Sequence, residues 1–121
     1  MDVNNYKAAE GSCIISEEVV ASIAGIAAME THGVAALVGR PGDMHGVMSS
    51  NAAARAIRVL NTENETVLDL YLTMKQGVKI QEVALQVQQN VKNAVQSMTG
   101  KAVTRVNVHI QGVKKEEKKE N

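Results

Sequence analysis

One 19-residue segment, residues 80–98, constrains the fold of this chain more than any other. Its apolar residues recur at the spacing of a helix that has one apolar face. They are Ile80, Val83, Ala84, Val87, Val91, Ala94, Val95 and Met98. Gly100 follows at the position where a glycine commonly ends a helix. The pattern predicts an amphipathic helix, which must bury its apolar face against a second layer of structure.

Three segments with strand character can supply that second layer. Residues 66–75 alternate apolar and polar side chains, as a strand buried on one face does. Residues 56–60 precede them, and the polar turn 61–65 has the length of a hairpin connection. Residues 104–111 alternate in the same way. We therefore expect a hairpin before the helix and a strand after it.

The first half of the chain predicts another helix, which begins after Ser16. The Ser16 hydroxyl suits an N-cap, and Glu17 and Glu18 suit the positive end of the helix dipole. His32 and Gly33 mark the expected end. The expected core-facing stripe consists of Val19, Ile23, Ile26 and Ala27, widened by Val20 and Ala24.

Shorter elements complete the expected order. Residues 11–15 and 34–38 read as short strands, and residues 49–55 as a turn or two of helix. The predicted fold is a two-layer α/β sandwich in which two main helices cover one face of a mostly antiparallel sheet, in the order strand-helix-strand-strand-strand-helix-strand. We expect a loose N-terminal arm over residues 1–10, one domain over 11–113, and a charged, solvated tail over 114–121.

Composition limits the classes of function. The 121 residues include no Phe and no Trp, so small aliphatic side chains must fill the core. Thirteen basic residues balance thirteen acidic ones, and without the tail nine basic and ten acidic residues remain, which leaves no basic field for phosphates. Cys13 is the single cysteine, so no disulfide forms within the chain. We expect a cytoplasmic protein.

The termini and apolar runs agree with that expectation. The N-terminal residues lack the charged and apolar regions of a secretory signal. The longest apolar run, residues 19–29, is shorter than the about 20 residues that cross a bilayer. Any membrane association would therefore be indirect, through a partner.

The loop Gly-Arg-Pro-Gly-Asp-Met-His-Gly at residues 39–46 permits two interpretations. Its first four residues fit the G-x-x-G pattern with which KH domains clamp a nucleic-acid backbone. However, KH loops join two helices, this loop follows a strand, and Pro41 lacks an N–H to offer. The alternative is a plain surface turn, because glycine and proline are common turn residues. The glycine spacing fits neither a P-loop nor a dinucleotide-binding motif.

Residues that could hold a metal or act as nucleophiles are scattered. His32, His45, His109 and Cys13 show no paired metal-ligand spacing. Cys13 has no neighbouring histidine, and no serine stands in a G-x-S-x-G elbow. The sequence therefore predicts no catalytic site, no metal and no cofactor.

Two polar surfaces remain as candidates for interaction. The sheet face opposite the helices would carry Asp69, Tyr71, Arg105, Asn107 and His109. The polar flank of the second helix is rich in glutamine and asparagine, including Gln86, Gln89 and Asn93. Neutral polar side chains cost less to desolvate than charges, which suits a subunit interface. The alternative for the flank is an ordinary solvated helix face.

Several sequence blocks resemble the alkaline shock protein family of bacterial envelope-stress proteins. These blocks are SEEVVASIAGIAA at 16–28, GV at 33–34, VLDLYL at 67–72, GV at 77–78, the segment 83–100 that ends in MTG, and VNVHIQGV at 106–113. The likeness covers roughly residues 11–113. Two regions depart from the family: Lys79-Ile80-Gln81-Glu82 replaces an Asn-Ile-Pro-Glu-like helix cap, and residues 39–55 match no block.

The resemblance implies a small cytoplasmic α/β protein without known catalytic activity. Related proteins are linked to alkaline shock and envelope stress, and some lie along the membrane through a separate membrane-anchored partner. The leading hypothesis is therefore a non-enzymatic, self-associating scaffold that such a partner recruits. The alternative is a small nucleic-acid-binding module that uses the sheet face around Tyr71, Arg105 and His109, or the loop from Gly39 to Gly42. With one tyrosine and a neutral charge balance, such binding would be weak and salt-sensitive.

Overall fold

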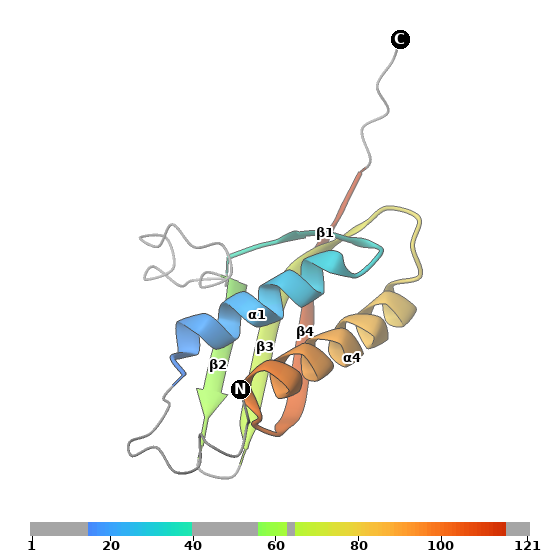
Figure 1. Ribbon diagram of the computed structural model, residues 1–121. Helices are drawn as coiled ribbons and strands as arrows, with labels where there is room; N and C mark the ends of the chain where they lie inside the picture. The colour runs from blue at the N-terminus through green and yellow to red at the C-terminus, as the bar shows by residue number, and fades with distance from the viewer. Residues whose placement is uncertain (1–14, 40–55, 63–64, 116–121) are drawn as a thin grey trace, which may run out of the picture.

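In the residues that the structure describes, a sheet is covered on one face by two helices. The computed structural model describes residues 15–39, 56–62 and 65–115. The elements run in the order α1 (Glu17–Glu30), β1 (Val34–Leu37), β2 (Ile57–Asn61), β3 (Thr66–Lys75), α4 (Ile80–Thr99) and β4 (Val103–Lys114). Both helices lie on the same side of the sheet (Figure 1). The predicted two-layer α/β sandwich is confirmed. The expected strand at 11–15, apart from Ile15, which is not in a strand, and the expected helical turn at 49–55 lie outside the described residues.

Strand β3 is the centre of the sheet and pairs with each of the three other strands in the described ranges. It is antiparallel to β1 and β2 and parallel to β4. Because β4 pairs along the whole of β3, β1 and β2 must share the other edge. Strand β1 ends at Leu37, which pairs with Leu72, and β2 begins at Ile57, which pairs with Leu70. The two strands therefore pair with neighbouring stretches of β3. Strands β1 and β2 are thus consecutive segments of one interrupted edge.

The parallel pairing of β3 with β4 requires a connection that crosses from one end of the sheet to the other. Helix α4 makes this crossover. Its N-cap residue, Lys79, makes no side-chain capping bond, in line with the departure seen in the sequence. Gly100 ends it in the left-handed conformation, with its N–H donated to the Gln96 carbonyl over 2.9 Å, as predicted. The crossover places α4 beside β4, the outer strand.

The core is built from aliphatic side chains between the sheet and the helices. Strand β3 alternates strictly, with one face fully buried, as its sequence predicts. Helix α4 buries the centre of its predicted stripe. The largest fully buried side chains come from these two elements: Leu68, Leu70, Leu72, Met74, Val87, Val91 and Val95. Close packing of these aliphatic side chains in one core cluster therefore replaces the aromatic residues that the chain lacks.

Helix α1 begins as predicted, but its buried face overlaps the expected stripe only in part. The Ser16 hydroxyl accepts a hydrogen bond from the Val19 N–H over 3.2 Å. The predicted core stripe is wrong in part, because Val19 is 48% exposed and Ile26 61% exposed. The buried face consists of Val20, Ala21, Ala24, Gly25, Ala27 and Ala28. The small residues on this face let the helix approach its neighbours closely. Because the helix is apolar on most sides, the spacing of its apolar residues alone does not select the buried face.

Two boundaries also differ from the expectation. Helix α1 ends at Glu30, before the expected stop, and Thr31 caps it through its backbone N–H. Gly33 then turns the chain into β1 with a φ of 104°. Strand β4 is longer than predicted and runs to Lys114, whose carbonyl accepts from the Gln76 N–H over 3.0 Å. The predicted domain end at residue 113 thus falls within β4.

Candidate interaction surfaces

The open face of the sheet carries a hydrogen-bonded cluster centred on Asp69. Asn107 Nδ2 donates to Asp69 Oδ1 over 2.8 Å, and His109 Nε2 lies 3.3 Å from the same oxygen. The parallel register brings Asp69 beside Asn107, and His109 follows two residues later on the same face. The Asp69 side chain is 17% exposed and that of His109 is 41% exposed. The structure therefore brings together three residues that the sequence could only assign to one face.

Tyr71 and His109 form a stacked pair at the same place. They are register partners on β3 and β4, their ring centroids lie 4.4 Å apart, and their planes differ by 9°. This separation is close to the spacing of about 4.8 Å between neighbouring strands. The rings consequently stand side by side across the two strands, each covering one face of the other. A nucleic-acid base that stacks flat on the sheet would need a ring face turned outward, which this pair does not offer.

The two arginines near this cluster are exposed and lie at its margins. Arg58 on β2 is the register partner of Asp69, and Arg105 on β4 is the register partner of Val67. Neither forms an ion pair within residues 15–39, 56–62 and 65–115. Arg105 precedes Asn107 by two residues along β4, but it is not part of the bonded cluster. We call the four residues Asp69, Tyr71, Asn107 and His109 the open-face cluster.

The predicted helix residues lie on the other side of the sandwich. Gln86, Gln89 and Asn93 are exposed on α4, so they form a surface separate from the open-face cluster. Gln89 Nε2 contacts Asn93 Oδ1 at 3.4 Å, and Gln86 Nε2 donates to Asn90 Oδ1 over 3.0 Å. Their amides are thus partly paired within the helix itself. The sequence predicted the helix flank and the sheet face as two separate polar surfaces, and the structure places α4 and the open face of the sheet on opposite sides of the sandwich.

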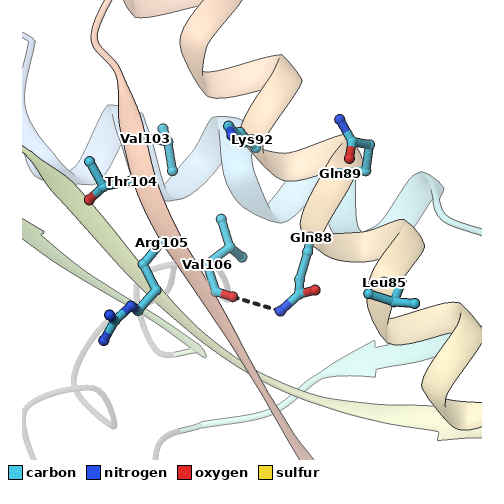
Figure 2. Close-up of a pocket in the computed structure, with 8 residues that line it drawn as sticks. All are labelled: Leu85, Gln88, Gln89, Lys92, Val103, Thr104, Arg105 and Val106. Carbon is cyan, nitrogen blue, oxygen red and sulfur yellow. Dashed lines mark hydrogen bonds between the residues drawn. The ribbon is translucent and has the colours of Figure 1, made fainter.

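A further site between α4 and the outer edge of β4 was missed by the sequence reasoning. It is a groove of about 370 Å³, lined by Leu85, Gln88, Gln89, Lys92, Val103, Thr104, Arg105 and Val106. Figure 2 shows the Gln88 amide reaching across it, and Gln88 Nε2 donates to the Val106 carbonyl over 2.9 Å. The Gln96 side chain accepts from the Val103 N–H over 3.0 Å. The only sequence signal is that Gln88 and Gln96 stand eight residues apart, on one side of the helix.

The described residues contain no cluster of side chains that could hold a metal ion. No three histidine, cysteine, aspartate or glutamate side chains cluster in that part of the chain. His32 is exposed after α1, whereas His109 belongs to the open-face cluster. Cys13, His45 and the loop residues after Gly39 lie outside the described ranges. Across the same described ranges, no helix has both the length and the apolar character needed to span a bilayer.

Comparison with known proteins identifies the relatives of this chain. The protein is 33% identical to YloU of Bacillus subtilis (strain 168) over 107 residues, which cover 86% of this chain and 89% of that protein. It is 31% identical to YqhY of the same organism over 111 residues, 85% of this chain and 77% of the relative. A Streptococcus pyogenes serotype M6 protein, Spy1614, is 29% identical over 108 residues, 87% of this chain and 89% of the relative. All three relatives are described as uncharacterised.

The family comparison gives a broader match. No solved structure matches the chain significantly. A family model matches residues 5–115, which include every described helix and strand, and its family is described as having a cell envelope-related function. The resemblance seen in the sequence is thereby confirmed. This chain belongs to the alkaline shock protein 23 family.

Proposed function

We propose that this protein is a non-enzymatic scaffold of the cell envelope that associates with copies of itself through the open face of its sheet. The observation that carries the proposal is the open-face cluster. Its side chains are half-buried and already bonded to one another, so little rotamer entropy remains to be lost on association. The face offers the Tyr71 ring, the Asn107 amide and the neighbouring exposed arginines, and aromatic and arginine side chains are enriched at subunit interfaces. Membership of a cell envelope-related family supports the cellular setting.

Recruitment to the membrane belongs to the same proposal. A membrane-anchored partner would hold the protein at the cytoplasmic side of the envelope, where self-association would extend the assembly along the membrane. The description of the family as cell envelope-related names no enzymatic activity. The scaffold remains the function that the site and the family favour together.

Fractionation of the native cells tests the recruitment step. A tagged protein is expressed at its normal level, and the membrane and soluble fractions are compared with and without nuclease treatment. We expect the protein in the membrane fraction in both samples, and we expect mild protease shaving of the membranes to release it. Recovery in the soluble fraction alone would contradict the recruitment step. Loss from the membrane fraction only after nuclease treatment would favour the nucleic-acid alternative.

A further inference from the structure

The outer edge of β4 is an unpaired strand edge within the described residues. Strand β4 pairs only with β3 among those residues, although it runs for 12 residues. The Val106 carbonyl accepts from Gln88 and so points away from β3. Because backbone groups alternate sides along a strand, Val108 and Ile110 direct their N–H and C=O groups to the same outer side. Such an edge is a template for another strand, and proteins usually protect it.

The protection of this edge is partial. The Gln88 side-chain amide donates a hydrogen bond to the Val106 carbonyl, and the Gln96 side-chain oxygen accepts one from the Val103 N–H. No corresponding bond covers Val108 or Ile110 among the described residues. A groove with a volume of about 370 Å³ lies beside this edge, between β4 and α4. A strand added at this edge would therefore find free backbone groups on one side and a groove for side chains on the other.

The charges beside the edge specify what such a strand must carry. Lys92 lines the groove on the α4 side, whereas Figure 2 shows the Arg105 side chain leaving β4 on the side away from α4. Both side chains are exposed, no acidic residue lines the groove, and neither cation forms an ion pair in the described part of the chain. Successive side chains of an added strand point to opposite faces. Two adjacent acidic residues would therefore reach one cation each.

A second copy of this chain does not supply that strand from its described edges. The edge strands β1, β2 and β4 contain no acidic residue, and β2 and β4 contain Arg58, Arg105 and Lys114. Pairing β4 with any of them would add no acid, and pairing it with β2 or β4 would bring cations together, which opposes pairing. In the described strands, the single acidic residue is Asp69, which lies in the central strand and is already bonded.

The geometry points to a peptide-binding site at the outer edge of β4 that accepts an extended acidic segment of a partner protein as an additional strand. The strand would bond to the outward backbone groups of Val108 and Ile110 and to the Val106 N–H, and would direct adjacent carboxylates to Lys92 and Arg105. This site rests on the proposed function in one respect, because the acidic segment would belong to the membrane-anchored partner proposed there. It is separate from the open-face cluster, so peptide binding and self-association can fail independently.

A defined peptide tests this assignment on the full-length protein. The probe is fluorescein-labelled Val-Thr-Val-Glu-Glu-Val-Thr-Val, and its matched control replaces both glutamates with glutamine. Fluorescence anisotropy at physiological salt gives Kd. We expect the Glu-Glu peptide to bind about tenfold more tightly than the Gln-Gln peptide, the scale of two modest ion pairs. Equal affinity of the two peptides, or no binding of the Glu-Glu peptide, would overturn the proposal.

Protein variants and hydrogen exchange locate the bound peptide. The variant Lys92→Glu/Arg105→Glu should raise Kd by about tenfold or more. Its control, Lys75→Glu/Lys79→Glu, makes the same charge change at exposed residues away from the groove and should leave Kd within about twofold. Bound peptide should also slow amide exchange at Val106, Val108 and Ile110. Equal Kd values for the two variants, or binding without slowed exchange in β4, would show that no strand is added there.

Discussion

The Asn90 side-chain amide donates a hydrogen bond to the Thr31 hydroxyl over 2.9 Å, which joins the middle of α4 to the end of α1. Thr31 is buried, and its hydroxyl in turn donates to the Ala27 carbonyl over 2.9 Å. The two helices are therefore held in register by a short polar chain in an otherwise aliphatic interface. Buried polar groups of this kind are costly to leave without a partner.

The first prediction concerns this link. Thr31→Val keeps the shape of the side chain but leaves the half-buried Asn90 amide without its acceptor. We expect the free energy of unfolding to fall by about 1–3 kcal/mol, measured by urea denaturation. Gln89→Ala, at an exposed position of the same helix, serves as the control and should change it by no more than about 0.5 kcal/mol. Equal effects of the two substitutions would contradict a structural role for the link.

The second prediction separates backbone strain from packing at two glycines. Gly33 and Gly77 have φ values of 104° and 92°. A Cβ at Gly33 would lie 2.7 Å from Val83 Cγ2, whereas a Cβ at Gly77 would have no atom within 4 Å. Gly77→Ala should therefore cost only the strain, about 1–3 kcal/mol, and Gly33→Ala should cost more.

A second substitution at the contact checks that explanation. Val83→Ala removes the methyl groups that would clash, so in this background the effect of Gly33→Ala should approach that of Gly77→Ala. Thermal unfolding of the wild-type protein, the three single variants and the Gly33→Ala/Val83→Ala double variant measures these effects. If Gly33→Ala lowers stability equally with and without the Val83→Ala substitution, the clash does not contribute.

The third prediction tests which face of α1 is buried. Ala28 is fully buried and lies outside the stripe expected from the sequence, so Ala28→Leu should overpack the interface and lower the free energy of unfolding by about 1–3 kcal/mol. Ile26 is largely exposed, so Ile26→Ser should change it by no more than about 0.5 kcal/mol. The reverse order of effects in chemical denaturation would restore the stripe expected from the sequence.

The sequence correctly predicted the buried side of those elements whose two faces differ strongly in polarity. Strand β3 and helix α4 each have one apolar and one polar face, so their periodicity alone defined the buried side. Helix α1 is apolar on several sides, and its buried face was selected by the close approach that Ala24 and Ala28 permit. The spacing of residues within a segment does not report such tertiary contacts.

The same distinction applies to the candidate surfaces: the face on which a residue lies was predictable, and its contacts with other elements were not. Alternation along β3 and β4 was enough to place Asp69, Tyr71, Asn107 and His109 on one face. Their bonding depends on the parallel register of β3 and β4, which alternation within each strand does not predict. The groove depends on where the α4 crossover sets Gln88 and Lys92 relative to the edge of β4, and no local pattern in the sequence encodes that distance.

The central claim is that copies of the protein associate through the open-face cluster, and sedimentation velocity over a range of protein concentrations tests it most directly. Tyr71→Arg places a cation in the cluster, and Gln86→Arg makes the same charge change on the helix layer. Circular dichroism first establishes that both variants are folded. We predict that the wild-type protein and Gln86→Arg form larger species as concentration rises, while Tyr71→Arg remains a monomer. A wild-type protein that stays monomeric throughout, or a Tyr71→Arg variant that associates equally well, would contradict the claim.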